Sequence, residues 1–147
     1  MQETLTRFEA VIRSAYGRLA QVSEGDSDAQ PEGMRWSRKQ ILGHLIDSAS
    51  NNHQRFVRSQ LAEQIQFPRY EQDAWVAAQA YAERPWGELV LLWRAFNLHV
   101  LHVARHVPAQ KLGNRCLVGD DEPITLGDHI KDYVDHLEHH LGQILDA

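Results

Sequence analysis

Cysteine occurs only once in this chain, as Cys116, so no intrachain disulfide can form. The sequence also lacks any stretch approaching the ~20 apolar residues that a membrane-spanning helix needs. Its first residues, MQETLTRFEAVIRS, carry charge in every helical turn and lack the apolar run of a signal peptide. We therefore expect a cytoplasmic protein with no disulfide and no membrane partner.

A surplus of basic residues is also absent. The 15 lysine and arginine residues are outnumbered by 20 acidic ones, which gives a net charge of −5 and a pI near 6.0. A dedicated nucleic-acid-binding protein needs a basic face to displace counterions from phosphates, so no nucleic-acid partner is expected. The 147 residues are 43% hydrophobic and 24% charged, as in an ordinary globular protein, and we expect one domain over residues 1–147.

Four long segments have apolar residues at steps of three and four, the period of a buried helix face. These segments are residues 3–22, 38–61, 85–107 and 125–145. Ser37 and Gln40 form an S-x-x-Q capping box before the second segment, and Thr125 is a suitable N-cap for the fourth. The pattern predicts an all-α fold, a four-helix bundle.

The connections give weaker signals. Residues 23–33 are rich in turn formers and acids and are expected to be a solvated loop. A short helix is expected at residues 74–82, after the breaker Pro68. Residues 109–123 are expected to be a loop with a short extended piece.

Nine histidines are the compositional oddity, and two of them have the spacing of a metal site. His136 and His140 are four residues apart on the fourth segment, so they project from the same helix face one turn apart. His129 and Tyr133 lie on nearly the same face and are candidates to support a ligand or line a pocket. The residue after His136 is Leu137 rather than the glutamate of an H-E-x-x-H protease, and this excludes the protease interpretation.

A third ligand is expected from the second segment, where His44 shares a helix face with Ser48, Asn51 and Arg55. Such a polar face is costly to bury unless each group has a partner, so it is expected to line a pocket. Three imidazoles would leave a position on a metal open, as in catalytic zinc sites. Asp47 or Asn51 is a candidate to orient a ligand.

Simpler interpretations stay open for each of these residues. An isolated pair of histidines four apart is usually part of a surface or a core, and a single helical histidine such as His44 is more often a hydrogen-bonded core residue. On the third segment, only His99 or His102 is expected to reach the pocket. The remaining histidines are expected to face solvent, and the four tryptophans are expected to belong to the core. Cys116 is expected to have no chemical role.

Two stretches together carry a family resemblance. WSRKQILGHLIDSASNNHQRF and, about ninety residues later, YVDHLEHHLGQI resemble the DinB/YfiT-like superfamily, and within it the DinB-like branch of small stand-alone domains. The resemblance implies an up-up-down-down four-helix bundle, a divalent metal such as zinc or nickel held by His44, His136 and His140, and a homodimer. It also implies a thiol S-transferase type of activity for some members, with low-molecular-weight thiols such as bacillithiol or mycothiol, and maleylpyruvate isomerisation for a related branch.

Three functional hypotheses follow. In the first, a metal-dependent enzyme acts on a small-molecule substrate: the metal activates a thiol, or alternatively ionises water for hydrolysis. Asn51, Arg55 and Gln40 would contact an anionic cofactor or substrate, with Arg55 best suited to a carboxylate. In the second, the protein is a non-catalytic, metal-stabilised bundle that binds a small molecule or a partner. In the third, no metal is bound.

Overall fold

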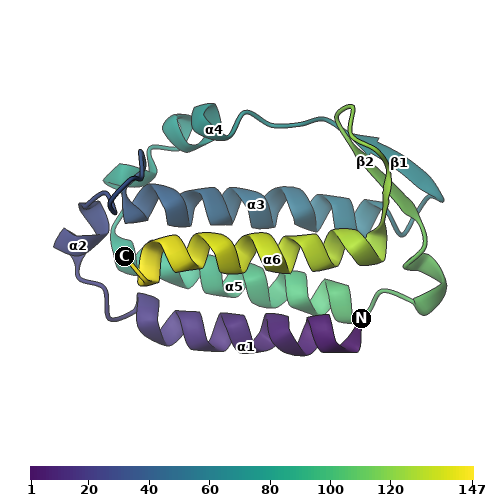
Figure 1. Ribbon diagram of the computed structural model, residues 1–147, viewed down its shortest axis with the longest axis horizontal. Helices are drawn as coiled ribbons and strands as arrows, with labels where there is room; N and C mark the ends of the chain where they lie inside the picture. Colours follow the sequence, from purple (N-terminus) through teal and green to yellow (C-terminus); the bar gives the residue numbers. More distant parts are fainter.

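Four long helices lie side by side in the computed structural model, which describes residues 1–147 (Figure 1). They are α1 (Gln2–Leu19), α3 (Arg38–Arg58), α5 (Trp86–Arg105) and α6 (Leu126–Leu145). The expected four-helix bundle is therefore confirmed, with helix ends within three residues of the expected ones. None of the helices combines the length and the apolar character that crossing a bilayer requires.

The directions of the helices differ from the expected up-up-down-down order. In Figure 1, α1 and α6 run from right to left, whereas α3 and α5 run from left to right. The order along the chain is thus up-down-down-up. The reason lies in the connection between α3 and α5, residues 59–85, which returns along the whole bundle before α5 begins (Figure 1).

The periodic apolar residues of each helix form the core. In α1 the buried residues are Leu5, Phe8, Ile12, Ala15 and Leu19, spaced by three and four. The core contains 27 buried residues drawn from all four long helices and from the α3–α5 connection. Trp86 and Trp93 belong to it as expected, but Trp36 is only partly buried and Trp75 is exposed.

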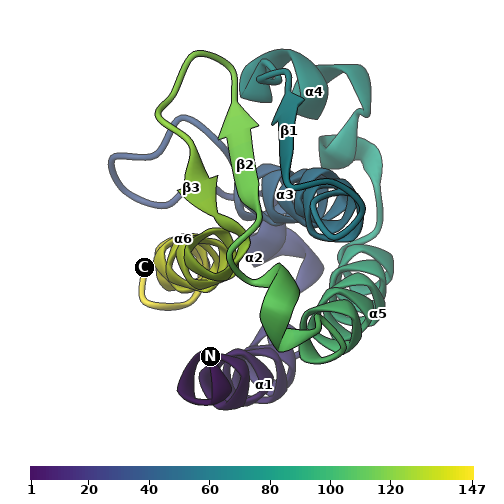
Figure 2. The same cartoon turned by 90° about the vertical axis from the view of Figure 1, so that its right-hand side faces the viewer.

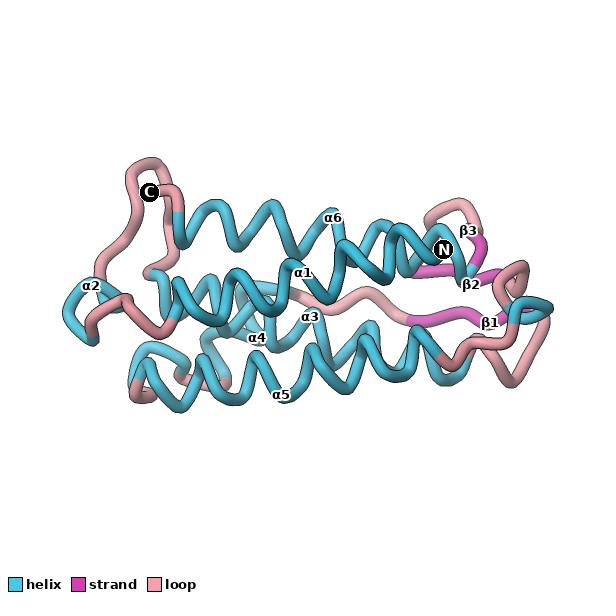
Figure 3. Tube along the Cα trace, turned by 90° about the horizontal axis from the view of Figure 1, so that it is seen from below, coloured by secondary structure: helices cyan, strands magenta, loops and turns pink.

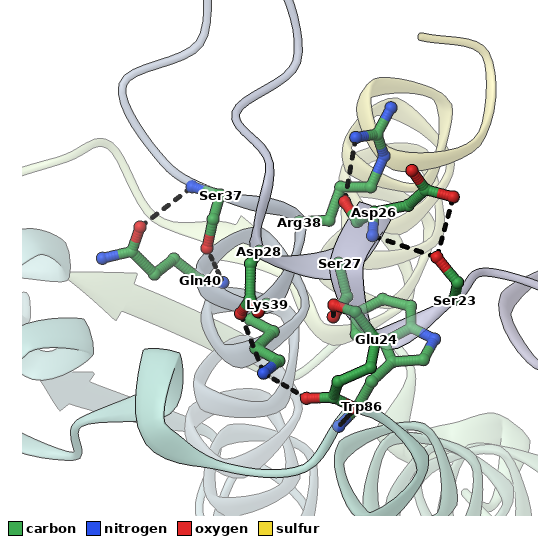
Figure 4. Close-up of polar contacts among 10 residues, drawn as sticks. All are labelled: Ser23, Glu24, Asp26, Ser27, Asp28, Ser37, Arg38, Lys39, Gln40 and Trp86. Carbon is green, nitrogen blue, oxygen red and sulfur yellow. Dashed lines mark hydrogen bonds and ion pairs between the residues drawn. The ribbon is translucent and has the colours of Figure 1, made fainter.

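The segment expected to be a solvated loop contains a short helix, α2 (Glu24–Asp28), capped by the Ser23 side chain. Lys39 explains why this helix is fixed. Its ammonium group is buried, with an ion pair to Glu24 and another to Asp28 at 2.9 Å (Figure 4). Glu24 also accepts a hydrogen bond from the backbone N–H of Trp86, so one carboxylate ties α2 to the starts of α3 and α5.

A small sheet makes the strict all-α expectation wrong. Its strands are β1 (Gln64–Phe67), β2 (Arg115–Val118) and β3 (Ile124–Thr125), in the order β1-β2-β3, with a parallel and an antiparallel pairing. The strands lie at one end of the bundle, beside α3 and α6 (Figures 2 and 3). Strands this short carry no periodicity of their own and form only because two distant connections meet there.

The same connection carries α4 (Gln72–Ala78), followed by a 3₁₀ turn at Tyr81–Glu83. The α4 helix confirms the short helix expected nearby, although α4 starts two residues and ends four residues before the expected bounds. A second 3₁₀ turn, Ala109–Lys111, follows α5. Both α4 and the three-stranded sheet lie outside the bundle, over the side that α3 and α6 share (Figure 2).

Candidate functional site

Three histidines from two helices converge at the seam between α3 and α6. The side chains of His44, His136 and His140 each offer a ring nitrogen, and these nitrogens lie within 4.8 Å of one another. The Nε2 atoms of His44 and His136 are 3.4 Å apart. Spacing in the sequence had selected the same three residues, and the structure brings them together.

Their position follows from the helices that carry them. His136 and His140 are one turn apart on α6, and their ring centroids are 4.5 Å apart. His44 is fully buried on α3, with the Trp36 ring 5.2 Å away on one side. The cluster is therefore shielded from bulk water on the α3 side, while His136 and His140 are half-buried.

Burial keeps the imidazoles neutral. It lowers the pKa of His44 to about 3 and that of His136 to about 4, with a smaller contribution from the neighbouring histidines. Burial also lowers the pKa of His140. At neutral pH each ring therefore has a free lone pair, which is the form that binds a metal ion.

Hydrogen bonds select which nitrogen carries that lone pair in two of the three rings, whereas Nδ1 of His44 is buried without a partner. The Nδ1–H of His140 donates to Oε1 of Gln143 over 2.7 Å, which leaves Nε2 free. Ser48 Oγ lies 3.5 Å from Nδ1 of His136. Three neutral imidazoles that direct Nε2 to a shared centre fit a divalent cation. Gln143 was missed in the sequence, although its place three residues after His140 was an available signal.

A polar pocket of about 520 Å³ adjoins the cluster, and His136 belongs to both. Four more expected residues line it: Ser48, Arg55, His129 and Tyr133. The other lining residues are Arg35, Asn52, Arg69, Tyr70, Glu71, Gln72, Asp73, Val118 and Asp132. The pocket therefore lies between the α3–α6 seam and the connection that follows β1.

His129 is held by a specific partner. The amide Nδ2 of Asn52 donates to the backbone carbonyl of Ser48 over 2.8 Å, so its Oδ1 accepts from Nε2 of His129, also over 2.8 Å. Burial, together with the charge of Arg55, lowers the pKa of His129 to about 4. His129 is thus a neutral lining residue that lies outside the three-histidine cluster.

Tyr133 lines the pocket with its ring, and its hydroxyl is occupied by a hydrogen bond within the core. The hydroxyl donates to Oδ1 of Asn97 over 2.7 Å in the core between α5 and α6. Burial raises the pKa of Tyr133, so the phenol remains protonated. Its role is to fix the pocket wall.

Asp47 does not support the metal cluster, which corrects one expectation. Its Oδ1 accepts hydrogen bonds from the Tyr81 hydroxyl and from Gln79 Nε2, both at 2.7 Å. Burial raises its pKa. Asp47 therefore anchors the end of α4 and the following turn to α3.

Asn51 and Gln40 are also committed elsewhere. Asn51 donates to the backbone carbonyl of Asp47 and does not line the pocket. The Gln40 side chain accepts from the backbone N–H of Ser37, so it completes the capping box of α3 (Figure 4). Neither side chain is placed to contact a ligand in the pocket.

His99 does not reach the pocket, and neither does His102. Both are exposed on α5, where His99 lies beside His53 with ring centroids 5.1 Å apart. The reason is rotation around the helix, because α5 buries Trp93, Asn97 and Val100 instead. Cys116 is buried in β2 and its thiol pKa is raised by burial, as suits an unreactive residue.

Asp132 is a pocket residue that the sequence analysis missed. It lines the pocket with His136 and His129 and is exposed there. Its spacing was a usable signal, because it lies three residues after His129 and four before His136. An exposed carboxylate at this place can accept a proton from a molecule in the pocket.

Comparison with known proteins agrees with this fold. The family model described as the DinB superfamily matches residues 7–144. Among solved structures, the chain is similar to YfiT from Bacillus subtilis, a probable metal-dependent hydrolase with an unusual four-helix bundle topology. The TM-score is 0.82 at 22% identity, and the match covers 99% of this chain and 86% of YfiT.

The mycothiol-dependent maleylpyruvate isomerase is also similar, with a TM-score of 0.83 at 11% identity. The match covers 97% of this chain but only 60% of the isomerase. At these identities the similarity to solved structures shows the fold alone. No curated protein matches the chain.

Proposed function

Because the chain belongs to the DinB superfamily, we propose that it is a divalent-metal-dependent enzyme acting on a small molecule, of the thiol S-transferase type. One observation carries the proposal: three neutral histidines from two helices converge beside a polar pocket. A purely structural metal site is usually closed by four protein ligands, whereas three leave room for a reacting molecule.

His44, His136 and His140 would hold the metal, zinc or nickel, through their ring nitrogens. When bound, a divalent ion lowers the pKa of a thiol, so that the thiolate forms near neutral pH. Gln143 and Ser48 keep two of the imidazoles in the required orientation. Trp36 and the buried face of α3 exclude water from the His44 side.

The transfer itself joins the sulfur of a low-molecular-weight thiol to an electrophilic carbon of the substrate. The carbon's leaving group departs, and the proton of the thiol leaves with it or passes to a base. Asp132 is the carboxylate of the pocket wall that lies on the same helix as His136, four residues earlier. We assign it the role of proton acceptor.

Hydrolysis is the second candidate, and Asp132 is also the observation that favours it. A carboxylate beside the metal ligands can take a proton from water as it takes one from a thiol. The similarity to YfiT, a probable metal-dependent hydrolase, points in the same direction. Turnover of an electrophile that needs an added thiol supports transfer, whereas p-nitrophenyl ester cleavage without thiol supports hydrolysis.

Metal content is the first test of the proposal. Protein purified without a histidine tag is expected to carry about one equivalent of divalent metal by elemental analysis, and His44→Ala is expected to lose it while retaining its helical circular dichroism spectrum. His139→Ala is the matched control, because His139 is exposed beside His140 but outside the cluster. A wild-type protein that neither carries nor takes up zinc, nickel or manganese would overturn the proposal.

A non-catalytic bundle gives a different result from an enzyme. In that case His44→Ala loses the metal and some stability, but no thiol-dependent or hydrolytic turnover exists to be lost.

The homodimer and the cytoplasmic location remain predictions. Light scattering of the metal-loaded protein tests whether the homodimer forms.

A further inference from the structure

Arg55 is a buried cation without a counter-ion. Only 8% of the residue is exposed, and no acidic side chain lies within ion-pair distance of its guanidinium. No hydrogen bond from its side chain is formed within the protein either. The guanidinium is largely desolvated, yet none of its nitrogens is fully buried, so it opens onto the pocket. A desolvated charge without a partner is costly, so a residue in this state points to a ligand that supplies the missing anion.

The place of Arg55 in the pocket strengthens this reasoning. Arg55 and Ser48 are both on α3 and both line the pocket, and Ser48 also contacts the metal-site residue His136. Tyr70, which is uncharged, and the neutral His129 are the neighbouring lining residues. A molecule in the pocket can therefore meet Arg55 and, at His136, one member of the three-histidine cluster at the same time.

The other two arginines of the pocket are already neutralised. Arg35 forms an ion pair with Asp73 at 2.9 Å, and Arg69 forms one with Asp121. Two further acids of the lining, Glu71 and Asp132, are exposed to water and add negative charge. The pocket thus offers one unpaired positive charge, which suits a single negative charge better than a dianionic phosphate.

We propose that Arg55 binds the carboxylate of a small carboxylic acid whose other end reaches the three histidines. The planar fork of a guanidinium matches a carboxylate with two parallel hydrogen bonds. This carboxylate names the substrate class of the proposed enzyme. Only the binding of the substrate's other end at the three histidines rests on the proposed function. Arg55 is eleven residues after His44, about 16 Å along α3, and this separation sets the length of substrate that the site would accept.

The test uses two series of probes of increasing length, ω-mercapto acids and their ω-mercapto amides, which differ only in the charge of the terminal group. Binding is measured by calorimetry to the zinc-loaded protein and by the thiolate-to-metal absorption band of the cobalt-loaded protein. For the best chain length, the acid should bind wild type about tenfold to a hundredfold more tightly than its amide. Arg55→Gln should abolish the preference, and the control Arg69→Gln should retain it.

A second measurement needs no metal. With chelator-treated protein, a simple carboxylate such as hexanoate should raise the melting temperature of wild type and of Arg69→Gln, whereas hexanamide should not. Arg55→Gln should lose the hexanoate effect. Its unliganded stability should equal or exceed that of wild type, because the variant removes an unpaired buried charge. If the variant does not fold, the acid-to-amide ratio of wild type still decides.

The outcomes separate the two proposals. Equal binding of acid and amide by wild type, or a preference that persists in Arg55→Gln, overturns the carboxylate site even where the cobalt–thiolate band shows the metal site to be intact. Conversely, if no thiol gives that band while hexanoate still stabilises the metal-free protein through Arg55, the carboxylate site stands and the thiol-transferase proposal fails.

Discussion

His129 and His136 lie on the same face of α6, seven residues apart, yet they have different partners. His136 belongs to the metal cluster, whereas His129 donates to Asn52 and has its second ring nitrogen buried without a partner. The Asn52 amide is itself fixed by the carbonyl of Ser48, so its oxygen can only face His129. A protonated His129 would place a second charge beside Arg55, and the site therefore selects the neutral ring.

This preference predicts a pH-dependent stability in the metal-free protein. The pKa of His129 is about 4 in the folded protein and about 6.5 when unfolded, so between these values the unfolded chain binds the extra proton. The contribution of His129 to the free energy of unfolding is therefore fully present above about pH 6.5 and decreases as the pH falls. From pH 8 to pH 5, His129 should contribute a loss of about 2 kcal/mol in the free energy of unfolding.

Urea unfolding at pH 8 and pH 5 checks this value, with His129→Gln as the comparison because glutamine retains a donor for Asn52. The variant should lose about 2 kcal/mol less than wild type over this range. The buried metal-site histidines remain in both proteins, so their contribution cancels in the difference. An equal loss in the two proteins would show that His129 is not held neutral.

Helix α3 is the central element of the molecule, and its two sides have different tasks. Residues 41–49 are all buried, because α5 and α6 cover one part of the helix and the α3–α5 connection covers another. One side presents His44 to α6. On the adjacent side Gly43 lets the ring of Tyr81 lie against the α3 backbone, so that the Tyr81 hydroxyl reaches Asp47.

Gly43→Ala is therefore expected to destabilise the protein. A Cβ at this position would overlap the Tyr81 ring, which is buried and held by the hydrogen bond from its hydroxyl to Asp47. Overpacking of this kind typically costs about 1–3 kcal/mol, measured by urea unfolding. Gly17→Ala on α1 is the matched control: nothing lies near its added Cβ, and a gain of up to about 1 kcal/mol from helix propensity is expected. Equal effects at the two glycines would refute the packing argument.

The elements that the sequence predicted correctly are those set by local rules. The apolar repeat defined α1, α3, α5 and α6, the capping box set the start of α3, and the four-residue spacing paired His136 with His140. What was missed depends on contacts between distant segments. The α2 helix needs Lys39, the sheet needs two connections to meet, and the direction of α5 depends on where residues 59–85 lead the chain.

The same distinction applies to the candidate site. His44 was chosen because it shares a helix face with other polar residues, and this geometry is local. Whether Asp47 or Asn51 lies next to the cluster depends on the neighbours of α3. Tyr81 and Gln79 take the Asp47 carboxylate, and Asn51 donates to the Asp47 backbone carbonyl, so neither supports the cluster. His99 was misplaced for a similar reason, since only packing fixes the rotation of α5.

At the scale of the whole molecule, the site adjoins the core without interrupting it. The 27 buried apolar residues of the core connect all four helices, and Tyr133 is the one among them that also lines the pocket. The pocket is closed on its outer side by chain from the α3–α5 connection and β2, not by the bundle itself. A ligand can thus bind and leave without disturbing the packing between the helices.

Removal of the metal is therefore expected to lower stability without unfolding the protein. After treatment with a chelator, the far-ultraviolet circular dichroism spectrum should keep its helical form, and heating should still give a single cooperative transition. Zinc added back at a hundred times its dissociation constant should raise the melting temperature by roughly 5–10 °C, because it binds only the folded chain.

The His136→Ala/His140→Ala double variant is the control, and its melting temperature should not respond to chelator or to zinc. If the chelator instead unfolded the wild-type protein, the metal would be a structural staple on which the fold depends. That result would favour the non-catalytic bundle over the enzyme, because catalysis at this site requires a bundle that stays folded while the reacting molecules come and go.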